Sequence, residues 1–319
     1  MISSYLSKFN NNINSFELLT GWSIIQVSGL DNKKYLQNHV TANILKLQFG
    51  THILCGNCNH QGRINSILRL FHNKKDYFYI QRSSICNIQM QEFRKYTVFS
   101  QVHIKELHNY IFLGLVGQQS KSILLSYFPY VPNDLNTVVF FKDCIILYFC
   151  KPVIRFLLII KKKKICHFNK ILVENNIPNI KKYWLFCDMK FGIPIIEQPV
   201  FQKFFPQELS LDVLQGIDFY KGCYCGQEMI SKIYFNNLNN KRLYCLIGYV
   251  NIPIGIYSNI ETYCNGSWRK VGYTVFFLNI VKNIFLVQCV LNKKNIHNNL
   301  FRLMLDQTSS LSIFENNIN

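Results

Sequence analysis

The sequence lacks a long uninterrupted apolar run. Its most apolar stretch, residues 144–160, is broken by Lys151, Pro152 and Arg155, whereas a membrane-spanning helix needs about 20 consecutive apolar residues. We therefore expect no membrane span. The first 16 residues are polar and rich in Asn, without the apolar segment of a secretory signal. Both absences favour a cytoplasmic protein.

The motifs of several large enzyme classes are also missing. The chain contains no P-loop, no G-x-G-x-x-G between a strand and a helix, and no recognisable Ser-His-Asp arrangement. Its 12 cysteines are dilute and irregularly spaced over 319 residues. This pattern excludes a small disulfide scaffold and fits reduced thiols in the cytosol.

Acidic residues are scarce, with 17 Asp and Glu against 35 Lys and Arg, which gives a formal charge of +18. Such an excess favours anionic partners such as nucleic acid, phosphate or a polyanionic small ligand. The chain is also crowded with Asn, Ile, Lys, Phe and Tyr, residues of AT-rich codons. Codon bias and function both explain the charge, and the composition does not separate them.

The sequence contains enough apolar residues for a large hydrophobic core, with 49% hydrophobic and 15% aromatic residues. The length indicates two or three structural units. A helix is expected after Asp31 as N-cap, with Leu36, Val40 and Ile44 on one face. Strands and helices mix without the regular alternation of a parallel sheet, which predicts an α+β fold with largely antiparallel sheets. The expected N-terminal strands are 22–27, 53–58, 64–71, 77–81, 102–104, 110–116 and 153–160, with a hairpin over 138–150.

Beyond residue 240 the helical signals fade. Short strand patterns over 244–250, 261–264, 272–277 and 284–291 are joined by turn residues, which is typical of a small β-barrel or sandwich. We place a domain boundary here, between an α+β region at 1–240 and a C-terminal barrel at 241–319.

The most informative segment covers residues 221–228. Two glycines permit unusual backbone angles or close approach of a ligand, and a thiol beside a lysine is a candidate low-pKa nucleophile. From the residues alone, a tight turn that happens to hold a cysteine is the simpler explanation of the segment. The segment reads Lys221, Gly222, Cys223, Tyr224, Cys225, Gly226, Gln227 and Glu228.

This segment closely resembles the K-G-C-Y-x-G-Q-E signature of the YgfZ family, and the resemblance extends in order over nearly the whole chain. The other matching positions are Gly21-Trp22, Gly29, Asp31, Tyr35-Leu36-Gln37, Val40-Thr41, Cys58, Gly62-Arg63, Leu68 to Phe71, Lys95-Tyr96, Val98 to Ser100, Val102, Trp184, Gly192, Pro194, Pro206-Gln207, Gly266, Trp268-Arg269 and Gly272.

The resemblance implies a fold like the glycine-cleavage T-protein, with two intertwined N-terminal α+β units and a C-terminal β-barrel around a central hole. It also implies a folate-binding accessory protein that acts in tRNA modification and maintains iron–sulfur enzymes. The folate, tetrahydrofolate or a derivative, is contacted in the family by two tryptophans that match Trp22 and Trp184. An indole offers a flat pterin a stacking surface, although core anchoring is the usual role of a tryptophan.

The chain departs from the family pattern at Cys225, where Thr is frequent, at Ser210, where Asn is frequent, and at residues 235–237, which replace an Arg-bearing turn. These changes bear on substrate geometry and not on the fold.

A metal site is not expected. One C-x-x-C at Cys55 and Cys58 with one C-x-C at Cys223 and Cys225 is a weak zinc pattern, and Cys55 reads as a buried strand residue. No catalytic carboxylate can be assigned. Asp188 is a local candidate, but solvation on a helix surface is the simpler interpretation.

Three functions thus remain: a non-catalytic folate-binding factor, a folate-dependent one-carbon transferase, and a basic RNA-binding protein that has lost its folate site. The first is preferred, with a monomer and iron–sulfur tRNA-modifying enzymes as partners, and with direct tRNA binding left open.

Overall fold

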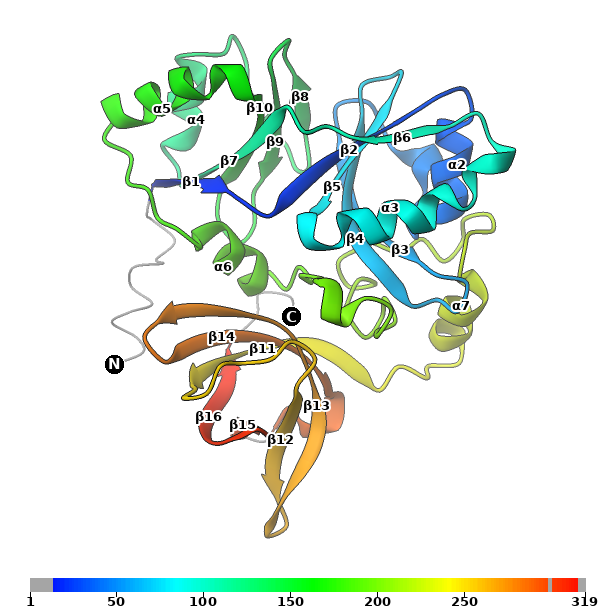
Figure 1. Ribbon diagram of the computed structural model, residues 1–319, viewed down its shortest axis with the longest axis vertical. Helices are drawn as coiled ribbons and strands as arrows, with labels where there is room; N and C mark the ends of the chain where they lie inside the picture. Colours follow the sequence, from blue (N-terminus) through cyan, green and yellow to red (C-terminus); the bar gives the residue numbers. More distant parts are fainter. Residues whose placement is uncertain (1–13, 298–299, 315–319) are drawn as a thin grey trace.

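The computed structural model describes residues 14–297 and 300–314. Two antiparallel sheets with their helices lie side by side, and a β-barrel lies below them (Figure 1). The predicted α+β architecture with a C-terminal barrel is confirmed. No helix in the described part of the chain is long and apolar enough to cross a membrane. Residues 1–13, on which the expectation about a secretory signal largely depends, lie outside the described residues.

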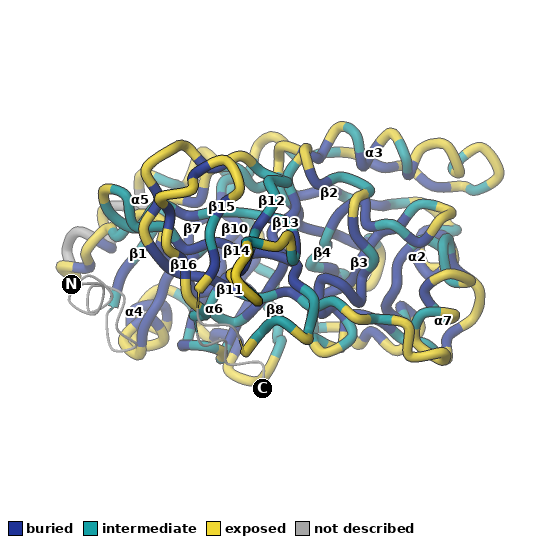
Figure 2. Tube along the Cα trace, turned by 90° about the horizontal axis from the view of Figure 1, so that it is seen from below, coloured by how far each residue is buried: buried dark blue, intermediate teal, exposed yellow. Residues whose placement is uncertain are grey.

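The first sheet has the strand order β3-β4-β5-β2-β6. Its alternating side chains face two different cores. Ile25 and Val27 of β2 pack under helices α2 and α3, whereas Ile24 faces the centre of the molecule. Figure 2 shows the corresponding alternation of buried and exposed residues along α3. The elements are β2 (Trp22–Ser28), α2 (Asn32–His39), η2 (Ile44–Lys46), β3 (His52–Cys58), β4 (Ile64–His72), β5 (Tyr77–Arg82), η3 (Ser83–Ile85), α3 (Cys86–Arg94), η4 (Thr97–Phe99) and β6 (His103–Glu106).

The second sheet has the order β1-β7-β10-β9-β8. Strand β1 precedes the whole first sheet in sequence but pairs with β7 of the second, so the two N-terminal units are intertwined. Helices α4 and α5 cover the outer face, and α6 packs on the inner one. The elements are β1 (Ser15–Leu19), β7 (Tyr110–Val116), α4 (Ser120–Leu125), β8 (Val138–Phe140), β9 (Cys144–Phe149), β10 (Arg155–Lys161), η5 (Lys162–Lys164), α5 (Ile165–Glu174) and α6 (Tyr183–Lys190).

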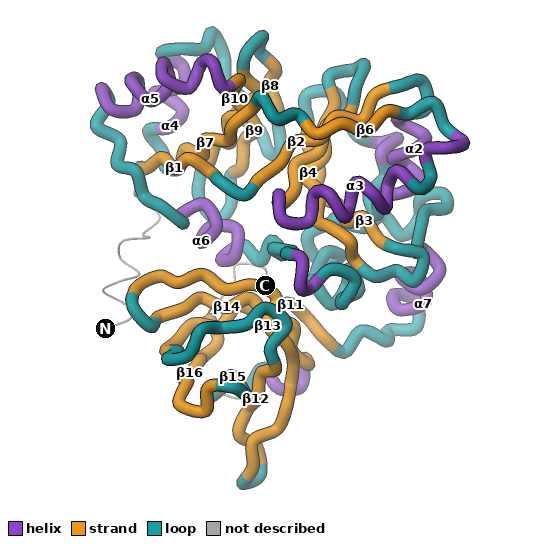
Figure 3. The backbone as a smooth tube through the Cα atoms, in the orientation of Figure 1, coloured by secondary structure: helices purple, strands orange, loops and turns teal. Residues whose placement is uncertain are grey.

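The C-terminal strands form a closed barrel in the order β11-β14-β13-β12-β15-β16, sealed by pairing of β16 with β11. Before it, a segment with little regular structure runs from α6 to α7 and then to the barrel (Figure 3). The elements are η6 (Gln198–Val200), α7 (Gln227–Phe235), β11 (Lys241–Tyr249), β12 (Asn259–Cys264), β13 (Ser267–Val281), β14 (Ile284–Asn292), η7 (Lys293–Asn295), β15 (Phe301–Leu303) and β16 (Asp306–Phe314).

The start and the end of helix α2 differ from the prediction. Asp31 precedes the helix, but its carboxylate accepts a hydrogen bond from the Gln101 amide at 2.8 Å in place of capping. The helix ends at His39, and Val40 is extended. Leu36, Val40 and Ile44 are nevertheless fully buried. The four-residue spacing therefore marks residues that are buried on the same side of the chain, but these residues do not belong to one continuous helix.

One core connects the three parts of the molecule. It combines inward residues of both sheets, the aromatic face of α6, and barrel residues such as Cys245 and Leu286. The cavity described next lies at the edge of this core.

Candidate functional site

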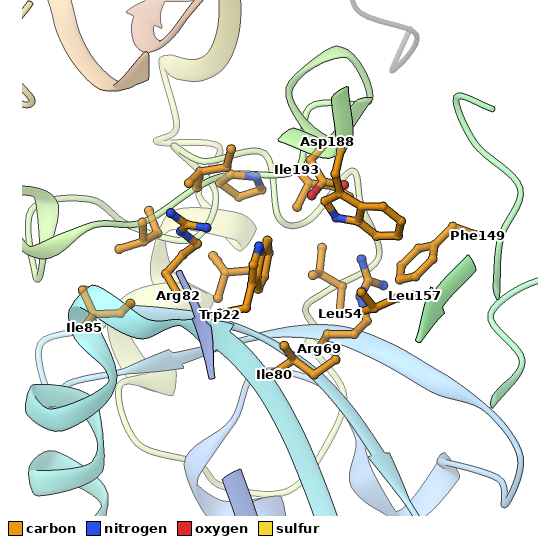
Figure 4. Close-up of a pocket in the computed structure, with 15 residues that line it drawn as sticks. Trp22, Leu54, Arg69, Ile80, Arg82, Ile85, Phe149, Leu157, Asp188 and Ile193 are labelled. Carbon is orange, nitrogen blue, oxygen red and sulfur yellow. The ribbon is translucent and has the colours of Figure 1, made fainter. Parts of the chain in front are cut away.

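A narrow, mostly apolar cavity of about 50 Å³ lies between the two sheets, α6 and the segment after α6 (Figure 4). Trp22 and Trp184 both line it, so the structure brings together the two tryptophans that the sequence singled out. Three charged residues interrupt the apolar wall. The lining consists of Trp22, Leu54, Ile67, Arg69, Ile80, Arg82, Ile85, Phe149, Leu157, Trp184, Asp188, Ile193, Pro194, Ile195 and Ile196.

Trp22 stands at the start of β2 and is partly exposed. Its cross-strand neighbour in β5 is Arg82, whose guanidinium lies 5.2 Å from the indole ring. Arg82 is held by Glu197 at 2.8 Å, while its buried Nη1 has no partner within the described residues. The Arg82 side chain therefore supplies the cavity with a free hydrogen-bond donor beside an aromatic face.

Trp184 is positioned by contacts on three sides. Glu17 of β1 accepts hydrogen bonds from the amides of Lys182 at 2.7 Å and Trp184 at 3.0 Å, which satisfies the start of α6. Burial raises the pKa of Glu17. Gly114 of β7 leaves room for the indole, because a Cβ there would lie 2.6 Å from Trp184 Cε3. The Phe149 ring lies edge-on to the indole, with 5.5 Å between the ring centroids.

Asp188 corrects a prediction. It is only 4% exposed and lines the cavity, where surface solvation was expected. The reason is a partner from β10 that the sequence did not identify: Arg155, fully buried, donates from Nη1 to Asp188 Oδ1 at 2.8 Å. The Arg155 guanidinium also lies 4.6 Å from the Trp184 ring. A charge inside the apolar run 155–160 was the signal that could have revealed a buried ion pair.

A second, wider cavity of about 520 Å³ adjoins the first and shares Leu54, Arg69, Phe149 and Ile193 with it. Its other lining residues include Lys151 and Arg155. The two cavities thus form an apolar, aromatic slot beside a roomier chamber with basic side chains.

The signature segment 221–228 lies elsewhere, and none of its residues lines either cavity. Lys221 is buried, and its ammonium donates to the carbonyls of Gln37 at 2.5 Å and of Val40 and Ala42 at 2.8 Å. Burial lowers its pKa to about 8, so the group is still mainly protonated at neutral pH. The sequence suggested that Lys221 activates the neighbouring thiol; in the structure its ammonium binds the last turn of α2 and the chain that follows it.

The other signature residues divide into buried and exposed. Tyr224 is buried, and the Gln227 side chain links the Tyr224 amide and the Lys221 carbonyl at 3.3 Å each. Cys223 and Glu228 are both exposed. Glu228 lies in the first turn of α7, where a negative charge is favourable.

The two signature glycines serve different purposes. Gly226 has φ +82°, and a Cβ there would lie 2.5 Å from the Asn59 carbonyl oxygen. It packs directly on Gly62 in the β3–β4 turn. A Cβ at Gly222, next to Cys223, would meet no other described atom within 4 Å. Steric contact within the described part of the protein therefore does not require glycine at 222.

The candidate metal ligands named from the sequence were Cys55, Cys58, Cys223 and Cys225. Among residues 14–297 and 300–314, no three His, Cys, Asp or Glu side chains gather as metal ligands would. Cys55 is a buried strand residue, and burial raises its pKa to about 12. Cys225 is half-buried, and its amide donates to the Asn38 carbonyl.

Comparison with known proteins identifies relatives of similar length. The tRNA-modifying protein YgfZ of Buchnera aphidicola subsp. Schizaphis graminum is 37% identical over 289 residues, covering 91% of each chain. The protein of that name from Yersinia enterocolitica is 34% identical over 295 residues, covering 92% of this chain and 89% of the relative. The chain belongs to the YgfZ family. No family model matches the sequence.

The family's fold is also found among solved structures. The glycine cleavage system aminomethyltransferase T from Bartonella henselae superposes with a TM-score of 0.79 at 12% identity, over 99% of this chain and 89% of that one. This establishes the T-protein-like fold predicted from the sequence. At such low identity, the likeness carries the fold alone.

Sequence reasoning missed three residues of the site: Arg69, Arg82 and Arg155. Each lies in a strand whose other residues are mainly apolar. Positive charge in such strands was the available signal, but which cavity each side chain enters depends on how the two sheets meet.

Proposed function

We propose that this YgfZ family member binds a folate in the cavity between Trp22 and Trp184 and serves as an accessory factor in tRNA modification that maintains iron–sulfur enzymes. The observation that carries the folate site is the convergence of the two tryptophans on one apolar cavity with few polar groups. Such a site suits a flat heteroaromatic ring that needs stacking surfaces and a small number of directed hydrogen bonds.

The polar groups fit a pterin. A pterin presents hydrogen-bond acceptors and donors along its edge. Arg82 Nη1, which has no partner among the described residues, can donate, and the Asp188 carboxylate can accept. The slot of about 50 Å³ must widen to take the whole ring. Trp22 is partly exposed at the start of β2, so we expect this side of the slot to move when the ring enters.

Titration with tetrahydrofolate tests the site. Binding should quench indole fluorescence in the wild type, and Trp22→Leu should weaken binding by about tenfold, the loss of one aromatic contact worth about 1–1.5 kcal/mol. Replacing both cavity tryptophans should cost roughly 2–3 kcal/mol. Trp268→Leu is the matched control, because this third tryptophan lies in the barrel against Arg302. Unchanged affinity in a folded Trp22→Leu, Trp184→Leu double variant would refute the assignment.

The link to tRNA modification is supported by the names of the relatives, and the exposed Cys223 of the signature is the residue through which it can be tested. The informative comparison is Cys223→Ala, Cys225→Thr and the double variant in cells that depend on this protein for iron–sulfur-dependent tRNA methylthiolation. Loss of modification with intact folate affinity is expected for Cys223→Ala. Full modification in both Cys223→Ala and the double variant would exclude a chemical role for the thiol.

A one-carbon transferase is the second candidate, and Asp188 favours it. Transfer chemistry on a folate needs a carboxylate near the ring for proton transfer, and Asp188 places one in the cavity wall. Its ion pair with Arg155, however, gives the carboxylate a structural partner. Multiple turnovers from an aminomethyl carrier to tetrahydrofolate, lost in Asp188→Asn, would establish the transferase; we expect none.

A further inference from the structure

Arg69 occupies an unusual position for a charged residue. It lies in the interior of β4, opposite Leu54 in β3 and Ile80 in β5, and its guanidinium sits 5.1 Å from the Phe149 ring. Within the described residues the guanidinium has no hydrogen bond or ion pair to the protein. Figure 4 shows the side chain rising from the sheet into the cavity between Leu54 and Phe149. A half-buried guanidinium with five donors and no acceptor is an incomplete arrangement.

The chamber beyond Arg69 is basic. Lys151 and Arg155 join Arg69 in its lining, and no acidic residue of the described chain does. Arg155 binds Asp188 through Nη1 and the Lys151 carbonyl through Nη2, while its Nε has no partner among the described residues. Asp188, in the wall of the slot, is the acidic group whose field acts on Arg69. The side chains of Arg69, Lys151 and Arg155 outnumber the single carboxylate of Asp188, so the chamber and its shared wall carry net positive charge.

The two cavities are arranged one after the other along a wall that they share. Arg69 and Phe149 belong to both linings, so a ligand that fills the slot and extends into the chamber must lie against them. A folate has this sequence of groups: a flat pterin, an aromatic spacer, and a glutamate with two carboxylates. Guanidinium and carboxylate pair through two parallel hydrogen bonds.

We propose that the basic chamber is the subsite for the glutamate end of the folate, with Arg69 as its carboxylate-binding residue and Arg155 Nε as an additional donor. This deepens the proposed function and depends on it. The apolar slot then provides stacking for the ring, and the chamber provides the charge that distinguishes a folate from an uncharged pterin.

The experiment compares tetrahydrofolate with tetrahydropteroamide, in which an uncharged primary amide replaces the glutamate, so that the ligand keeps the pterin and the aromatic spacer but has no carboxylate. The wild type should bind tetrahydrofolate about 10- to 100-fold more tightly, the range expected for charge-assisted hydrogen bonds. Arg69→Met should bind both ligands with similar affinity, close to that of the wild type for tetrahydropteroamide. Arg69→Lys, which keeps the charge without the two-pronged geometry, should fall between. Arg269→Met, exposed on β13, is the control for a general loss of positive charge and should resemble the wild type.

The outcomes separate the two proposals. If neither ligand binds the wild type, the proposed function fails. If both bind equally well, folate binding stands and the glutamate subsite is wrong; this comparison needs no variant to fold. Equal weakening of both ligands by Arg69→Met in a folded protein would also overturn the subsite. Competition by millimolar inorganic phosphate as strong as that of free glutamate would show a general anion site instead.

Discussion

Replacing Lys221 by methionine should destabilise the protein strongly, although the residue belongs to the signature of a functional loop. The side chain is 6% exposed, and its ammonium donates to three backbone carbonyls at 2.5–2.8 Å. Methionine keeps most of the aliphatic stem and removes all three bonds. A hydrogen bond to a charged group contributes about 1.5–3 kcal/mol. Since water can reach some of the freed carbonyls, we expect a total loss of about 3–5 kcal/mol.

Denaturant unfolding gives the overall loss, and amide hydrogen exchange over residues 36–42 gives its location. Exchange should accelerate at Val40, because the Lys221 ammonium fixes the turn that leaves α2. Cys223→Ala is the matched control, since Cys223 lies in the same loop but is exposed, and it should change stability by less than about 0.5 kcal/mol. A loss below about 1 kcal/mol in Lys221→Met, with unchanged exchange at residues 36–42, would refute a structural role for this lysine.

Three further predictions concern other residues. Gly226→Ala should destabilise the loop, because its φ of +82° and the Asn59 carbonyl leave no room for a Cβ. Gly222→Ala should unfold at the same denaturant concentration as the wild type. Equal stability of the two variants would contradict the different roles of these glycines. Asp188→Ala should lower the free energy of unfolding by about 3–5 kcal/mol, because Arg155 is then buried without its carboxylate partner. A change under about 1 kcal/mol in denaturant unfolding would show that water replaces the carboxylate. Burial raises the pKa of Glu17 above 4.5, so the folded chain keeps this proton at pH values where the unfolded chain has lost it. The free energy of unfolding should therefore fall as pH rises through a window that begins near 4.5. Glu17→Gln should flatten that part of the stability–pH curve, and an unchanged slope would exclude Glu17 as its source.

Local patterns were sufficient for much of the fold. The strands predicted at 53–58 and 64–71 match β3 and β4 to within one residue at each end, because each strand faces one core on each side. The C-terminal strands were found for the same reason, apart from β15 and β16, whose short or polar sequences carry little alternation. The boundary proposed at residue 240 falls immediately before β11.

Long-range pairing could not be predicted from such patterns. Nothing in residues 15–19 indicates that β1 joins a strand far along the chain, at residues 110–116, or that its Glu17 caps α6. The Arg155–Asp188 pair is likewise a contact between two separate elements, β10 and α6, that local sequence patterns do not connect. The two tryptophans could be named from family resemblance, but the charged residues around them required the structure.

The cavity and the signature loop are separate, yet they share a core. Leu54 and Ile193 of the cavity wall pack in the same cluster as Tyr224 of the signature. Contact alone does not couple two sites, because coupling requires an element with two arrangements that both sites bias. We therefore expect tetrahydrofolate to leave the alkylation rate of Cys223 unchanged, measured by mass spectrometry of the peptide that contains it. Exposed Cys166 is an internal control for reagent access. A change of more than about twofold at Cys223 alone would show that the β3–β4 hairpin, on which Gly226 packs, transmits folate occupancy to the loop.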